Sequence, residues 1–60
     1  MEFEFDGIAY RLERGRASGV WMLFQDLQGR VSWRFVREFP AAIYDEDIKD
    51  RATVFLREGL

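Results

Sequence analysis

Acidic residues are the first candidates for chemistry in this chain, because carboxylates bind divalent metals and serve as acids and bases. Four of them lie close together, at Asp45, Glu46, Asp47 and Asp50. A calcium loop that started at Asp45 would need glycine where Asp50 stands and glutamate where Leu56 stands. Capping of a helix N-terminus explains the cluster fully. We therefore expect no metal site.

The chain has few side chains that could serve as nucleophiles in covalent catalysis. The hydroxyl groups come from two serines, one threonine and two tyrosines, and the chain has neither histidine nor cysteine. A hydroxyl nucleophile is normally activated by a neighbouring base, most often histidine. The glycines of residues 15–19 do not form a phosphate-binding loop, since the lysine of that motif is missing. The sequence predicts no catalytic residue and no cofactor, and we expect a protein that is not an enzyme.

Arginines alternate with aromatic residues in the middle of the chain, a pattern that can bind nucleic acid through stacking and phosphate contacts. The arginines concerned are Arg11, Arg14, Arg16, Arg30, Arg34 and Arg37. Against Glu13 and Asp26 they give residues 10–37 a charge of +4, whereas the whole chain carries −2. Nucleic-acid-binding domains are usually basic, and these arginines have many acidic residues to pair with. Nucleic-acid binding is therefore the alternative hypothesis.

The elements that position these residues begin with a β-hairpin. Asp6 and Gly7 separate two alternating runs, and an Asp-Gly pair is typical of a type I′ turn with positive φ at both positions. A two-residue turn places Phe5 opposite Ile8 and Phe3 opposite Tyr10. The apolar side chains of the hairpin then share one face: Phe3, Phe5, Ile8, Tyr10 and Leu12.

Two further strands are predicted at about residues 20–25 and 30–38, joined by a turn at residues 26–29. We favour a three-residue loop with a bulge at Gly29, which places Asp26 opposite Arg30. This register puts one apolar set on the first face, namely Trp21, Leu23, Val31, Trp33 and Phe35. The second face then holds Val20, Met22, Phe24 and Val36. A turn formed by Gln28 and Gly29 would instead group Val20, Met22 and Phe24 with Val31, Trp33 and Phe35, but it also leaves both faces apolar.

The last element is a helix at about residues 46–58, after Pro40 has ended the fourth strand. Its apolar stripe is formed by Ile48, Ala52, Phe55 and Leu56, with Asp45 as N-cap and Gly59 as the stop. The fold class predicted is α+β: a four-stranded antiparallel meander with one C-terminal helix packed on one face, in a single domain spanning residues 1–60. With neither a signal peptide nor an apolar run of ~20 residues, we expect a cytoplasmic location and no membrane contact.

The second apolar face leads to the functional hypothesis. One short helix can cover only one side of a sheet, and a chain of 60 residues is close to the lower size limit for folding alone. We therefore expect a small non-enzymatic protein-interaction module, most simply a homodimer, of the kind used as a regulator or inhibitor. Its predicted contact residues are Val20, Met22, Phe24 and Val36, with Arg34 at their border.

Overall fold

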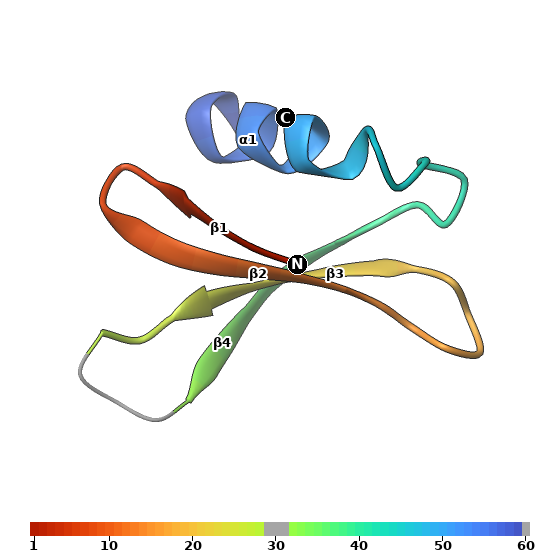
Figure 1. The fold of residues 1–60 in the computed structure, drawn as a ribbon, viewed down its shortest axis with the longest axis horizontal. Coiled ribbons are helices and arrows are strands. Elements are labelled where there is room, and N and C mark those ends of the chain that lie inside the picture. Colours follow the sequence, from red (N-terminus) through yellow and green to blue (C-terminus); the bar gives the residue numbers. More distant parts are fainter. Residues whose placement is uncertain (29–31, 60) are drawn as a thin grey trace.

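The computed structural model describes residues 1–28 and 32–59, which form one antiparallel sheet followed by one helix (Figure 1). The strands follow one another in the order β1-β2-β3-β4, so that β1 and β4 are the edges. The predicted α+β meander with a C-terminal helix is confirmed. The elements are β1 (Glu2–Phe5), β2 (Ile8–Arg14), β3 (Trp21–Asp26), β4 (Trp33–Phe39) and α1 (Ile48–Glu58).

The first hairpin forms as the sequence predicts. Asp6 and Gly7 have φ values of 55° and 80°, the left-handed conformations that a type I′ turn requires. Phe5 lies opposite Ile8 and Phe3 opposite Tyr10. The rings of Phe3 and Tyr10 stack with their centroids 5.7 Å apart, so the turn fixes a register that brings the apolar side chains of both strands together.

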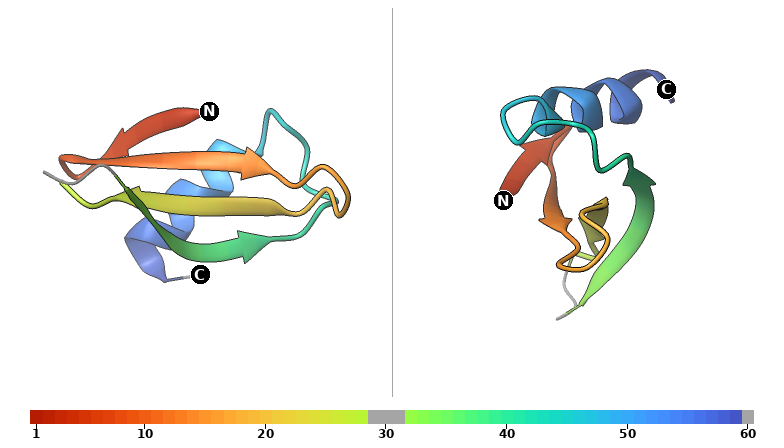
Figure 2. Two further views of the ribbon diagram at one scale, coloured as in Figure 1. Left: turned by 90° about the horizontal axis from the view of Figure 1, so that it is seen from below. Right: turned by 90° about the vertical axis from the view of Figure 1, so that its right-hand side faces the viewer.

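The core lies between this sheet and α1, which crosses one face only (Figures 1 and 2). Leu12, Leu23 and Ile48 are completely enclosed. The buried set comprises Tyr10, Leu12, Trp21, Leu23, Phe39, Ile48 and Ala52, and Phe55 and Leu56 pack against it. The predicted helical stripe is therefore the stripe that meets the sheet.

Of the two ends predicted for α1, only the C-terminal one agrees with the structure. Gly59 adopts a φ of 77°, and its amide donates to the Phe55 carbonyl at 2.7 Å, as expected for a helix stop. At the other end, the prediction of Asp45 as N-cap is wrong. The N-cap position belongs to Asp47, whose side chain makes no capping bond. The Asp45 side chain pairs with Arg14 at 2.6 Å.

The pairing of β3 with β4 differs from both registers predicted from the sequence. Asp26 lies opposite Trp33, and Trp21 lies opposite Phe39. Between these two pairs the register shifts, leaving Val36 as an extra residue in β4. The predicted bulge at Gly29 lies outside the described residues.

The physical reason for this register is the burial of Phe39. Its ring meets the ring of Phe55 edge-on, with centroids 6.0 Å apart, under the helix. Because Phe39 lies opposite Trp21, the two strands are offset from the pairing that a short turn would give. The connection between Asp26 and Trp33 is accordingly longer than the predicted three-residue loop.

Candidate protein-interaction face

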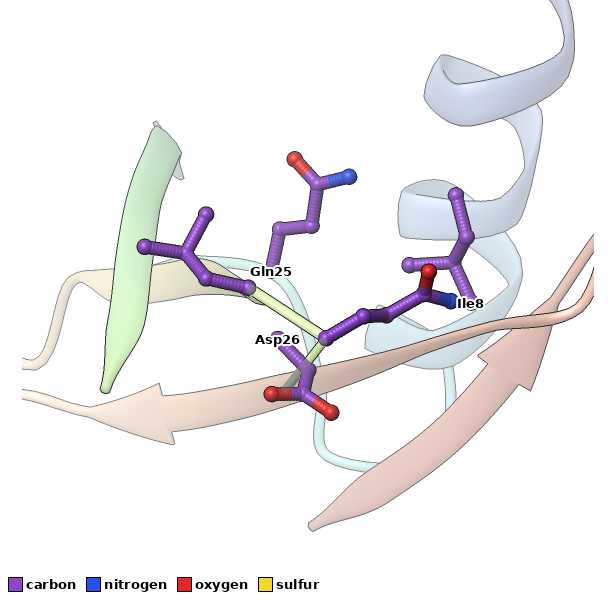
Figure 3. A pocket seen from close by; sticks show the side chains of 5 residues that line it. Ile8, Gln25 and Asp26 are labelled. Carbon is purple, nitrogen blue, oxygen red and sulfur yellow. The ribbon is translucent and has the colours of Figure 1, made fainter. Parts of the chain in front are cut away.

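A shallow depression at the end of β3 is the first place to look for a small-molecule site. It measures about 430 Å³ and is lined by Ile8, Gln25, Asp26, Leu27 and Gln28 (Figure 3). Its polar groups are two amides and one carboxylate, which bring no nucleophile beside a base. In the described part of the chain, no group of three acidic side chains is arranged to hold a metal ion. These groups therefore do not single out the depression as a functional site.

The face of the sheet opposite α1 carries a more distinctive feature. Directly paired residues of antiparallel strands point to the same face. Phe24 is paired with Arg11 on one side and Phe35 on the other, so these three share the outer face. Alternation along the strands adds Met22 and Trp33. We call Met22, Phe24, Trp33 and Phe35 the outer apolar patch.

The aromatic rings of the outer apolar patch are held in defined positions. The rings of Phe24 and Phe35 meet edge-on, with centroids 5.8 Å apart. Phe35 is nevertheless 51% exposed, and Met22, Phe24 and Trp33 are half-buried. The guanidinium carbon of Arg11 lies 4.5 Å from the centre of the Trp33 ring. The patch is thus ordered while a large part of its apolar surface stays in water.

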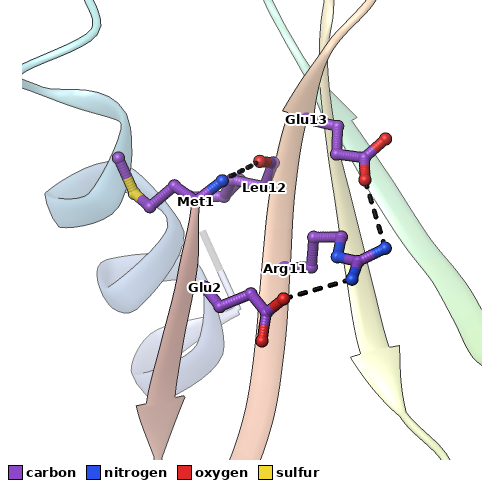
Figure 4. Close-up of polar contacts among 5 residues, drawn as sticks. All are labelled: Met1, Glu2, Arg11, Leu12 and Glu13. Atoms are coloured by element: carbon purple, nitrogen blue, oxygen red, sulfur yellow. Dashed lines mark hydrogen bonds and ion pairs between the residues drawn. The ribbon is translucent and has the colours of Figure 1, made fainter.

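Arg11 is itself fixed by two carboxylates on the side of the hairpin away from α1 (Figure 4). It lies 3.1 Å from Glu2 on β1 and 3.3 Å from Glu13 on its own strand. In the same view, the Met1 nitrogen donates to the Leu12 carbonyl at 3.0 Å, which continues the ladder of the hairpin. These two ion pairs favour the position of Arg11 over Trp33.

No helix or strand of the described residues covers the outer apolar patch. Seen from the side opposite the helix, the four strands lie in front and α1 lies behind them (Figure 2, left). The end of β4 and the segment that follows it lie on the helix side: Phe39 belongs to the core cluster, and Ile43 packs against that cluster. Tyr44 is 69% exposed.

Carboxylates surround the outer apolar patch. Met22 lies between Glu13 on β2 and Glu38 on β4 in a single row across the sheet. Asp26 is paired with Trp33. The outer face therefore carries five acidic residues and one basic residue, Arg11, a formal charge of −4 among the described positions; the acids are Glu2, Glu4, Glu13, Asp26 and Glu38.

The structure separates the contact residues predicted from the sequence. Met22 and Phe24 lie on the outer face, as predicted. Val20 precedes β3, and its carbonyl accepts the Gly15 amide in the loop. The assignment of Val36 to this face is wrong, because the bulge turns its side chain to pack against the core cluster.

Arg34 and two aromatic residues also lie on other faces of the sheet than the favoured register predicts. Arg34 is paired with Gln25, which shares a face with buried Tyr10, so its predicted place beside the patch is wrong. Trp33 and Phe35, which the favoured register assigns to the helix face, lie on the outer face with Met22 and Phe24, the grouping predicted by the alternative turn at Gln28 and Gly29. The pairing of Asp26 accounts for both differences, because it lies opposite Trp33 and not opposite Arg30 as predicted, an odd shift along β4 that reverses the faces of the residues before the bulge.

The arginines of the nucleic-acid hypothesis are divided between the two faces. Arg11 is on the outer face, whereas Arg37 lies 4.7 Å from the ring centres of both Phe39 and Phe55 on the helix side. Arg14 stacks 4.9 Å from the Trp21 ring and pairs with Asp45. Arg16 is exposed in the loop after β2, and Arg30 lies outside the described residues. The described arginines therefore do not form one continuous basic surface.

Comparison with other proteins found no family model, curated protein or solved structure that matches this chain. Within residues 1–28 and 32–59, no helix has the length and apolar character needed to cross a bilayer. The outer apolar patch and its ring of carboxylates are therefore the features on which a functional proposal can rest.

Proposed function

We propose that this protein is a small non-enzymatic interaction module that binds another protein chain through the outer apolar patch. The observation that carries the proposal is Phe35, which is 51% exposed while it contacts Phe24 on an uncovered sheet face. Contiguous exposed apolar side chains on a small protein usually mark a contact site, and aromatic residues, methionine and arginine are enriched in such sites.

The rigidity of the patch favours binding. Its side chains project from paired antiparallel strands rather than from a loop. Arg11, which stacks on Trp33, is held by its ion pairs with Glu2 and Glu13. Little conformational entropy is lost when such a surface is covered. Complete burial of one large apolar side chain contributes about 1.5–3 kcal/mol, so a few of them are enough for a specific contact.

Two kinds of occupant fit this proposal: a second copy of the chain, as the sequence predicts, and a protein of different sequence. In either case the module acts by occupying a surface of its partner, which is how regulators and inhibitors work without chemistry of their own. We keep the cytoplasm as its proposed location.

The proposal is tested by comparing aspartate substitutions on the two faces. Met22→Asp and Phe24→Asp should weaken association with a partner and lower the free energy of unfolding less than Phe55→Asp, whose ring packs against Phe39 in the core. Association is measured by sedimentation velocity at micromolar concentration, and stability by urea unfolding. Equal destabilisation by all three substitutions would show that both faces serve as core, and the proposal would be lost.

A further inference from the structure

We infer that the occupant of the outer apolar patch is a basic protein segment, one that carries arginine or lysine beside apolar side chains, and not a second copy of this chain. The inference rests on the proposed function and specifies its partner. It is carried by the charge of −4 among the described positions of the outer face.

The carboxylates lie directly beside the apolar side chains of the outer apolar patch. Met22 has a glutamate on each side, and Trp33 has Asp26 opposite it. Directly opposed side chains in antiparallel strands have Cβ atoms about 4.5–5.5 Å apart. A partner side chain that buries its apolar part on Met22 or Trp33 thus places its neighbours within reach of a carboxylate.

Three of the five carboxylates of the outer face have no ion-pair partner in the described part of the chain. Among the described residues, the ion pairs of the outer face are those of Arg11 with Glu2 and Glu13. Glu4, Asp26 and Glu38 make no ion pair within that part of the chain. Basic side chains of a partner would provide the missing counter-charges, which speeds association and selects against acidic partners.

The same charges argue against the homodimer predicted from the sequence. A twofold dimer places the same patch on both sides of the interface. Counting the described residues, two outer faces would then bring five carboxylates of one copy against five of the other, with one arginine from each. Like charges that face each other across an interface are costly. Nucleic acids and anionic lipid surfaces are disfavoured for the same reason.

Three synthetic peptides serve as probes. The first alternates arginine with leucine over ten residues; the second replaces each arginine by glutamate, and the third replaces each leucine by serine. Binding is followed by the indole N–H signals in two-dimensional NMR of the labelled protein. Trp33 reports on the outer face, while Trp21, whose Nε1 donates to the Ile43 carbonyl at 3.1 Å in the core, serves as the internal control.

The arginine-leucine peptide should shift the Trp33 signal and leave that of Trp21 unchanged, with an affinity that falls about tenfold when ionic strength rises from 50 to 300 mM. The serine peptide should bind more weakly, since it lacks the apolar part, and the glutamate peptide should not bind. The variant Glu4→Gln/Glu38→Gln should lose about tenfold in affinity. Its matched control is Glu46→Gln/Asp50→Asn, which changes the net charge equally on exposed residues beside and within α1 and should bind like the parent.

Other outcomes separate the inference from the proposed function. No Trp33 shift with the arginine-leucine peptide at millimolar concentration overturns the inference. Equal binding of the glutamate peptide, or equal loss in both double variants, overturns it as well. A dimer in sedimentation velocity that Phe35→Asp dissociates would also overturn it, while supporting the proposed function. If Phe35→Asp unfolds the chain as readily as Phe55→Asp, the patch is part of the folding core and the proposed function fails too.

Discussion

Arg14 and Asp45 are 31 positions apart in the sequence, and yet Nη1 of the arginine lies 2.6 Å from Oδ1 of the aspartate. The same guanidinium donates to the carbonyl of Ala41 at 2.6 Å and, through Nε, to that of Gly19 at 3.0 Å. It also stacks on the ring of Trp21. One side chain thus joins the β2–β3 loop to the segment that leads into α1, and it helps to hold the helix over the core.

Replacing Arg14 by alanine should lower the free energy of unfolding by about 1–2 kcal/mol, mainly through the lost bonds to the two carbonyls. The ion pair itself adds little, because both side chains are substantially exposed. Arg14→Lys is the informative control, since lysine keeps the charge but cannot present the same planar set of donors. It should lose most of the same stability in urea unfolding. An unchanged midpoint for Arg14→Ala would contradict this role.

The turn of the first hairpin offers a second prediction. Gly7 has a φ of 80°, and a Cβ atom built there would have no neighbour within 4 Å. Gly7→Ala should therefore cost about 1 kcal/mol through backbone strain alone. Asp6→Asn tolerates the left-handed conformation and should stay within about 0.5 kcal/mol of the parent. Thermal unfolding would detect the difference as a shift of about 4–8 °C for a domain of this size, and equal midpoints would count against a strained turn.

The register of β3 and β4 can be tested with paired cysteines, because the chain contains none of its own. Met22 and Glu38 lie opposite each other, at a Cα separation of about 4.5–5.5 Å that a disulfide can span. Oxidation of Met22→Cys/Glu38→Cys should therefore yield the cross-linked chain. The register predicted from the sequence would instead favour Met22→Cys/Arg34→Cys, which should remain reduced because those positions are about 10 Å or more apart. Mass spectrometry of the oxidised proteins distinguishes the two registers.

Local sequence signals predicted those parts of the fold that local chemistry determines. The Asp6-Gly7 turn set the register of the first hairpin, and the spacing of Ile48, Ala52 and Phe55 identified the buried stripe of α1. The pairing of β4 depended instead on Phe39, which is buried against an element sixteen positions further on, at Phe55. No turn motif records such a distant contact.

The sequence predicted some residues of the candidate site correctly and others wrongly. Met22 and Phe24 were placed correctly because they alternate along β3 with Trp21 and Leu23, which are buried in the core. The favoured register assigned Trp33, Phe35 and Val36 to the wrong sides because it paired Asp26 with Arg30, whereas Asp26 lies opposite Trp33, an odd number of residues further along. The general inference that a second apolar face exists did not depend on the register, although its composition did.

The contact between Arg11 and Trp33 gives a further prediction. Arg11→Ala should uncover the indole ring and make it more accessible to a neutral quencher such as acrylamide. The accompanying loss of stability should be only about 0.5–1 kcal/mol, as is typical of an exposed cation–π contact. Arg16→Ala removes an equal charge from the exposed loop and should change neither quantity. Equal quenching in both variants would show that Arg11 does not shield Trp33.

The extra residue at Val36 has a consequence for solubility. β4 is an edge strand, and the open hydrogen-bonding groups of such a strand can recruit strands from other molecules. The bulge divides β4 into two regular runs, residues 33–35 and 37–39, whereas stacking into fibrils uses uninterrupted segments of about six or seven residues. The interruption of β4 at Val36 therefore disfavours continuous strand pairing between molecules along this edge.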